Sequence, residues 1–271
     1  MEPSSAPGSK PSLIDSGIAE PRGSSFSGPG TGDLLRHVTP IVTAVMVDAG
    51  FFLKRARHLF GSLSPEAAAK KLHRLALDHL NDNRGRQRTA RLYRIFVYDA
   101  PPVAWKGHTP LGKKSLDLGK SDTALWRHKF HDELRGQRKV ALRMGEIPTS
   151  QVRWQLDPGA LKDLTNGKRR WDELSDDDFR LDFRQKGVDM RLGLDIASLS
   201  YKRQVNQIVL ISGDADFVPA AKLARREGID FILDPMWATI RPDLFEHIDG
   251  LRSVCPKPVK KAKDGPAANP A

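Results

Sequence analysis

The sequence predicts a three-layer α/β/α fold whose central sheet is mainly parallel. Several short runs consist almost wholly of β-branched and apolar residues, which is typical of strands that are buried on both faces. Segments with a helical spacing of apolar residues lie between these runs. Strands that alternate with helices along a chain usually form a parallel sheet with helices on its faces.

The first part of the chain supplies two strands and one helix. Residues 41–50 (IVTAVMVDAG) form the first expected strand. A helix is expected over 64–80, where Ser64 is a favoured cap, Pro65 suits the first helical position, and an apolar stripe follows (Leu72, Leu75, Ala76 and Leu80). Residues 91–102 (RLYRIFVYDAPP) form the second strand, which is closed by its two prolines.

The last third of the chain continues the alternation. The pattern predicts a helix over 188–204, a strand over 207–214, a helix over 216–228, a strand over 229–234 and a short helix over 241–253. The helix over 216–228 ends in a glycine, which is common just beyond a helix. These elements complete four buried strands with helices between them.

The middle of the chain, about residues 103–180, fits this scheme poorly. Residues 122–144 predict a helix that breaks near Gly136 and continues into an extended piece. The stretches KGHTPLGKKS, LTNGKRRWDEL and SDDDF show no such pattern. We interpret this region partly as an insertion whose basic loops line a substrate groove, and a variable solvated loop region is the alternative.

The two ends of the chain differ from the domain between them. Residues 1–38 are rich in Ser, Gly and Pro and are expected to be disordered. Residues 39–254 form the expected folded domain. Residues 255–271 are expected to form a disordered basic tail, which either adds phosphate contacts or is simply solvated.

Composition narrows the class of partner. The formal net charge is +11 and the isoelectric point is near 9.8, which favours polyanions and above all nucleic acid. No apolar run is long enough to cross a membrane, and the first residues do not resemble a secretory signal. A single cysteine, Cys255, can form neither an internal disulfide nor a CxxC metal site, so we expect a cytoplasmic protein.

Acidic residues follow the expected strands. Asp48, Asp99 and Asp214 each end one strand, Asp216 follows two residues later, and Asp234 ends the fourth. The carboxyl ends of parallel strands meet at one edge of a sheet, where ligands bind. Each acid alone could simply cap a helix, and Asp216 could be no more than that. Several together repel one another unless a cation lies between them.

The helix over 188–204 adds two acids at the margins of its apolar stripe. Asp189 lies in the first turn, near the strand ends, and is the better candidate for a metal ligand. Asp195 lies about 9 Å further along the axis, so it would bind a second ion, orient a water or hold a Lys or Arg side chain. Ser212 could bond a neighbouring acid or a phosphate oxygen, and Gly213 permits a tight turn, although both also suit an ordinary turn.

Carboxylates without histidine or cysteine indicate Mg²⁺ or Mn²⁺ rather than zinc. The pair His128 and His131 is expected on a solvated helix surface. An acidic metal site in a basic protein suits phosphodiester hydrolysis, because the ion activates a water and stabilises the developing charge. The candidate metal ligands are Asp48, Asp189 and Asp214, and Asp216 joins them as a candidate catalytic residue.

Three ordered motifs, VMVDAGFF, KGVDMRLGLDIA and VLISGDADFVPAAKLARREGID, resemble the NYN domain, a LabA-related branch of the PIN-like ribonuclease superfamily. The resemblance implies a PIN-like, Rossmann-like fold and metal-dependent cleavage of RNA. It places the family's acids at Asp48, Asp189, Asp195, Asp214 and Asp216. Many relatives have Asn three residues after the first of these acids, where this chain has Phe51.

The expected partner is RNA, and single-stranded DNA and a homodimer are left open. Candidate nucleic-acid contacts are the basic residues of the middle region and of the segment before the 188–204 helix (Lys113, Lys114, Lys168, Arg169, Arg170 and Lys186). The alternative function is a catalytically weak or inactive PIN-like module that binds RNA or recruits partners. A haloacid-dehalogenase-like phosphatase is disfavoured because Gly50 stands where that chemistry needs a second Asp.

Overall fold

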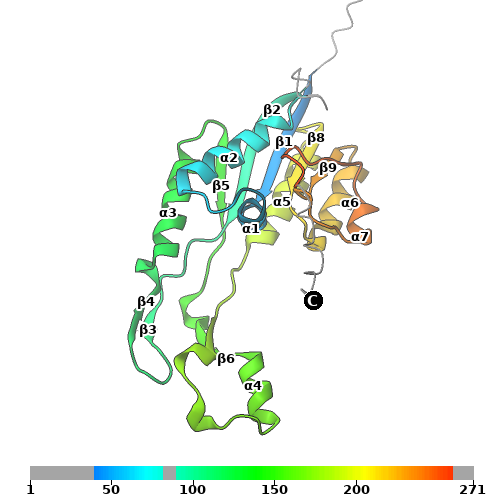
Figure 1. The fold of residues 1–271 in the computed structure, drawn as a ribbon. Coiled ribbons are helices and arrows are strands. Elements are labelled where there is room, and N and C mark those ends of the chain that lie inside the picture. Colours follow the sequence, from blue (N-terminus) through cyan, green and yellow to red (C-terminus); the bar gives the residue numbers. More distant parts are fainter. Residues whose placement is uncertain (1–39, 82–89, 259–271) are drawn as a thin grey trace, which may run out of the picture. The chain divides into compact units, whose positions relative to one another are not determined.

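A computed structural model describes residues 40–81 and 90–258 of the chain (Figure 1). The expectation for residues 1–38 lies outside the described residues, as does all of the expected basic tail beyond residue 258. Within the described ranges, no helix is long and apolar enough to cross a membrane.

The centre of the fold is a six-stranded sheet in which every paired neighbour is parallel. Its strand order is β10-β9-β8-β1-β2-β5. The bounds are Ile41–Asp48 (β1), Ala90–Asp99 (β2), Val140–Met144 (β5), Gln207–Ile211 (β8), Asp230–Asp234 (β9) and Gly250–Leu251 (β10). The four strands expected from the sequence are β1, β2, β8 and β9, and the structure adds the two edge strands.

Helices cover both faces of this sheet, which confirms the three-layer α/β/α prediction (Figure 1). One face packs against α1 (Ala49–Phe60), α2 (Pro65–Asp78) and α3 (Asp122–Arg135), and the other against α5 (Val188–Tyr201), α6 (Val218–Arg226) and α7 (Pro242–Phe245). Alternate residues of β1 point to opposite layers: Val45 and Val47 join the first core, and Ala44 and Met46 join the second.

The helix α1 is absent from the sequence prediction. It begins directly after β1, and the side chain of Asp48 accepts a hydrogen bond from the backbone N–H of Phe51, which caps the helix. Because the last residue of the strand is also the helix cap, no loop separates the two elements, and the sequence lacks the usual signal of a helix start. Its buried side includes Phe52 and Ala56. By contrast α2 begins as predicted, with the Ser64 hydroxyl accepting from the Ala67 N–H.

Only part of the region 103–180 departs from the central fold. The helix α3 ends at Arg135 with Gly136 as its C-cap, and β5 follows as an edge strand of the main sheet. The remainder contains two antiparallel strand pairs and a short helix: β3 (Lys106–His108) with β4 (Ser115–Asp117), β6 (Arg153–Leu156) with β7 (Phe179–Asp182), and α4 (Pro158–Thr165).

The acidic run SDDDF holds basic segments of this region in place. The Asp176 carboxylate accepts hydrogen bonds from the backbone N–H groups of Leu111 and Gly112, at the tip of the β3–β4 hairpin. Asp178 accepts two bonds from the guanidinium of Arg169. The acidic run therefore connects two basic loops through hydrogen bonds.

The last expected helix, over 241–253, is mostly not helical. Only four residues form α7, and the chain then pairs with β9 as β10. The Asp249 carboxylate accepts from the backbone N–H of Phe231 in β9 and from the side chain of Arg225 in α6. These bonds draw residues 249–251 to the sheet edge, and the local sequence pattern contains no sign of such distant partners.

Candidate active site

The topology of the sheet reverses between β1 and β8. From β1 the chain moves outward through β2 to β5, and it then returns to the other side of β1 as β8. Ligands of open α/β sheets bind beyond the carboxyl ends of the strands at such a switch point. Val47 is paired with Ile211, so Asp48 and Ser212 leave the sheet side by side.

Asp48 is half-buried at this point. One carboxylate oxygen accepts from the Phe51 N–H at 3.0 Å, and the other accepts from the Ser212 hydroxyl at 3.4 Å. Burial raises the pKa of Asp48, the nearby carboxylates of Asp189 and Asp99 raise it further, and the N–H donors act in the opposite direction.

Asp189 is the second residue of α5, which begins after Gly187 in the left-handed conformation at φ 77°. Its side chain is exposed. Partial burial raises the pKa of Asp189, and repulsion from Asp214 and Asp216 raises it further. The N-terminus of α5 therefore brings Asp189 within electrostatic reach of both the β1 and the β8 ends of the sheet.

The loop after β8 carries the other two acids. Asp214 accepts a bond from the Asp216 N–H at 3.0 Å and caps a short 3₁₀ turn, Ala215–Phe217, while its own N–H donates to the Ser212 hydroxyl at 3.3 Å. The fully buried Ser212 side chain thus joins Asp48 to the Asp214 loop. Asp214 and Asp216 both have exposed side chains.

Gly213 serves close packing rather than a left-handed turn. The φ angle of Gly213 is not positive, so the turn itself does not require glycine. A Cβ added at this position, however, would lie 2.6 Å from an edge carbon of the Phe51 ring. The phenyl ring that stands at the common Asn position therefore packs directly on the loop between Ser212 and Asp214.

Asp48, Asp189, Asp214 and Asp216 have no cationic partner: among the described residues, no Lys, Arg or His forms an ion pair with any of them. Carboxylates without a cationic partner attract a hard cation, so this donor set fits Mg²⁺ or Mn²⁺. Within 40–81 and 90–258, no three His, Cys, Asp or Glu side chains are already gathered as a ligand group.

Two further candidates, Asp99 and Asp195, form hydrogen bonds and ion pairs with neighbouring side chains. Asp195 accepts bonds from the Tyr98 hydroxyl and the Arg143 guanidinium, so it holds an arginine, one of the roles predicted for it. Asp99 is 4% exposed and binds Arg127 at 2.8 Å and His131 at 2.7 Å through the same oxygen.

Two expectations from the sequence are altered by this packing. His131 is not on a solvated surface as predicted, because its ring is buried against Asp99. The fourth strand-end acid, Asp234, is also buried, and it bonds His79 at 2.9 Å and the backbone N–H of Met236. Asp234 is therefore satisfied by internal partners.

The predicted nucleic-acid contacts lie in three places. Lys113 and Lys114 lie in the β3–β4 hairpin, and the Lys113 ammonium bonds the Pro110 carbonyl. The residues after α4 divide by exposure: Lys168 and Arg170 are exposed, and Arg169 is held by Asp178. The last candidate, Lys186, is exposed and its backbone pairs with that of Glu146 just before α5.

Three cations near the site were missed by the sequence prediction: Lys54 and Arg57 on α1, and Arg127 on α3. They line a pocket that also includes Gly50, two residues from Asp48. A useful sequence signal was the run FFLKRARHLF directly after the first strand, in which basic and apolar residues alternate at helical spacing.

The described residues thus form a three-layer α/β fold with acidic residues at the switch point of its sheet. Residues 163–240 match the family model of the NYN domain. This match, over less than a third of the chain, confirms the NYN resemblance drawn from the motifs, and the LabA-related branch stays a prediction. It includes Asp189, Asp195, Asp214 and Asp216, whereas Asp48 precedes it. The NYN domain belongs to the PIN-like nuclease superfamily.

Among solved structures, the chain is similar to that of a protein of unknown function from Vibrio parahaemolyticus. It is 14% identical, with a TM-score of 0.42, and the similarity covers 80% of this chain and 94% of the other. No curated protein matches the sequence.

Proposed function

We propose that the protein is a metal-dependent ribonuclease that hydrolyses RNA phosphodiester bonds at the acidic site beyond β1 and β8. The observation that supports this most is the position of Asp48, Asp189, Asp214 and Asp216 around the switch point of the sheet, within electrostatic reach of one another and with no described cation paired to them. A protein of net charge +11 attracts the RNA backbone, and an acidic centre within it needs a divalent cation to accept phosphate.

Mg²⁺ or Mn²⁺ held by Asp48, Asp189 and Asp214 would lower the pKa of a bound water and stabilise charge on the phosphate. The Phe51 N–H and the Ser212 hydroxyl orient the two oxygens of Asp48. A carboxylate oxygen of Asp216 accepts the proton of the attacking water, whose oxygen bonds to phosphorus as the bond to the leaving ribose oxygen breaks, and that oxygen takes a proton from solvent water to leave as a hydroxyl.

The substrate follows from charge and exposure. The exposed basic residues Lys114, Lys168 and Lys186 supply phosphate contacts beyond the acidic site. Single-stranded DNA has the same backbone charge and is a second substrate to be tested beside RNA. A cytoplasmic location agrees with the single buried cysteine, Cys255.

Cleavage of an end-labelled RNA by the purified chain tests this proposal. We expect cutting with Mn²⁺ or Mg²⁺, none in excess chelator, and a loss of about 100-fold or more in Asp189→Asn, because one ion contact is worth several kcal/mol in the transition state. Undiminished cutting in chelator would overturn the mechanism.

The alternative is a PIN-like module that binds RNA without cutting it. Two observations favour it: the acids are not preassembled as a ligand group in the described residues, and Phe51 replaces the common Asn. It predicts RNA binding with no cleavage at any Mn²⁺ or Mg²⁺ concentration. The same labelled RNA, run with and without the ion, separates the two functions.

A further inference from the structure

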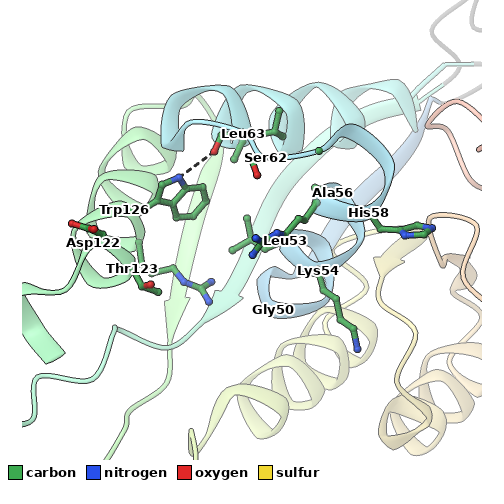
Figure 2. A pocket seen from close by; sticks show the side chains of 14 residues that line it. Gly50, Leu53, Lys54, Ala56, His58, Ser62, Leu63, Asp122, Thr123 and Trp126 are labelled. Atoms are coloured by element: carbon green, nitrogen blue, oxygen red, sulfur yellow. Dashed lines mark hydrogen bonds between the residues drawn. The ribbon is translucent and has the colours of Figure 1, made fainter. Parts of the chain in front are cut away.

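A large pocket opens beside the acidic site, on the layer formed by α1, α2 and α3. Its volume is about 870 Å³, and it is lined by α1, by the segment between α1 and α2, and by the first turns of α3. We call it the α1–α3 pocket. Figure 2 shows Leu53 on its α1 side and Trp126 on its α3 side, with Leu63 of the connecting segment beside the indole.

One wall of the pocket is apolar and fixed. The Trp126 indole N–H donates to the Leu63 carbonyl at 3.1 Å (Figure 2). Its ring also stacks on Phe130 with centroids 5.4 Å apart. Leu53 and Ala56 of α1 complete this wall. A half-buried aromatic ring held by both a hydrogen bond and a stacking neighbour is a rigid surface against which a planar base can pack.

The rest of the lining is mainly cationic. Lys54 and Arg57 are exposed, and neither has an ion-pair partner among the residues that the structure describes. Arg127 is held by Asp99 at 2.8 Å, so its guanidinium has a set position at the pocket. Asp122 is the one acid in the described lining. Three cations against one acid make the pocket attractive to phosphate groups.

The pocket extends to Gly50, two residues from Asp48 of the proposed active site. This residue lines the pocket, and a Cβ added to it would lie 3.3 Å from a carboxylate oxygen of Asp48. An RNA strand with one phosphate at Asp48 can therefore place its next nucleotide in the pocket.

We propose that the α1–α3 pocket binds one or two nucleotides of a single-stranded RNA next to the phosphate that is cut. The base lies against Trp126 and Leu53, and the phosphates contact Lys54, Arg57 and Arg127. The volume lies within the range of roughly 300–1,000 Å³ typical of ligand pockets. Stacking on an aromatic ring beside a basic groove is the common mode for single-stranded nucleic acid. This inference rests on the proposed ribonuclease function.

The experiment measures binding separately from cleavage. A fluorescein-labelled 12-nucleotide single-stranded RNA is titrated with the full chain in excess chelator, and its anisotropy is followed at several salt concentrations. The test variant is Lys54→Ala/Arg57→Ala. The matched control is Lys222→Ala/Arg226→Ala, which removes the same two side chains from exposed positions on α6, in the opposite helix layer.

We expect the test variant to bind at least about 10-fold more weakly, and the control to stay within about 2-fold of wild type. Loss of two phosphate contacts to a single strand should also reduce the slope of log K against log salt by about 1.4. Melting curves of both variants show whether each is folded, and both replaced pairs are exposed.

Each result decides a different point. Equal weakening and equal slopes in the two variants, or no binding by the wild type, would overturn the pocket assignment. RNA binding that depends on Lys54 and Arg57, without cleavage by the wild type in Mn²⁺, would support the pocket and overturn the ribonuclease function.

Discussion

Asp48 belongs to both the fold and the candidate site. It ends β1, caps α1 through the Phe51 N–H, and receives the Ser212 hydroxyl. Its raised pKa, which results from burial and from Asp189 and Asp99, means that its ionised form is disfavoured in the folded state. Ionisation of this carboxylate in the folded state costs free energy, and a bound cation would offset that cost.

Replacement of Asp48 by Asn tests this cost, because Asn also caps helices well and has no charge. A raised folded-state pKa lowers stability as the pH rises from the ordinary value of 3.8 towards the folded value, and the loss is complete above it. In chelator at pH 7, Asp48→Asn should therefore melt at a higher temperature than the wild type, and the difference should disappear at low pH.

Mn²⁺ should reverse that order. At about 100 times its Kd the ion should stabilise the wild type by about 2.7 kcal/mol and Asp48→Asn by much less. Thermal melts with and without Mn²⁺ measure this difference. A lower melting temperature for the variant in chelator, or equal stabilisation of both proteins by Mn²⁺, would contradict the account of Asp48.

Gly213 gives a second test at the residue scale. In Gly213→Ala the new methyl would lie 2.6 Å from the Phe51 ring, so either the ring or the loop must move. We expect a loss of about 1–3 kcal/mol in the free energy of unfolding. Adding Phe51→Leu should recover part of this loss, as a double-mutant cycle by urea unfolding would show. Additive losses would mean that the Phe51 ring is not the obstacle.

At the scale of elements, local signals decided what the sequence could predict. The strands β1, β2, β8 and β9 and the capped helix α2 carry unmixed local patterns and were predicted. The helix α1 was missed because its cap is the last residue of a strand. The short strand β10 depends on Asp249, whose partners lie 18 and 24 residues earlier in the chain.

The same reasoning applies to the candidate acids. The position of Asp48 and Asp214 after neighbouring parallel strands could be predicted, because parallel strands place their carboxyl ends at one edge. The internal hydrogen-bond partners of Asp99 and Asp234 could not be predicted from the sequence. Their partners, His131 and His79, lie 32 and 155 residues away in sequence, on α3 and at the C-terminal cap of α2. Whether a strand-end acid forms an internal ion pair therefore depends on which side chains the covering helices place beside it.

The contact between β2 and α3 gives a prediction at this scale. Asp99→Ala leaves Arg127 and the buried His131 without their shared carboxylate, so we expect a loss of about 3 kcal/mol in the free energy of unfolding. The matched control is His128→Ala on the same helix, where an exposed side chain should cost less than about 0.5 kcal/mol. Urea unfolding measures both, and equal losses would show that the Asp99 contacts contribute nothing.

For the whole molecule, the main feature is an acidic centre within a strongly basic chain. The net charge of +11 draws a polyanion towards the surface, whereas the carboxylates around Asp48 repel its phosphates. A bound divalent cation would reconcile the two, because it would add positive charge where the strand ends place negative charge. Metal dependence is therefore the central claim about function.

The rate of RNA cleavage as a function of Mn²⁺ concentration tests this claim most directly. The comparison is between wild type, Asp214→Asn and the control Asp230→Asn, whose exposed carboxylate bonds Gln207 at the opposite edge of the sheet. We expect saturable cleavage in the wild type and the control, and a loss of about 100-fold or more in Asp214→Asn. Cleavage by Asp214→Asn at the wild-type rate and Mn²⁺ dependence would contradict it.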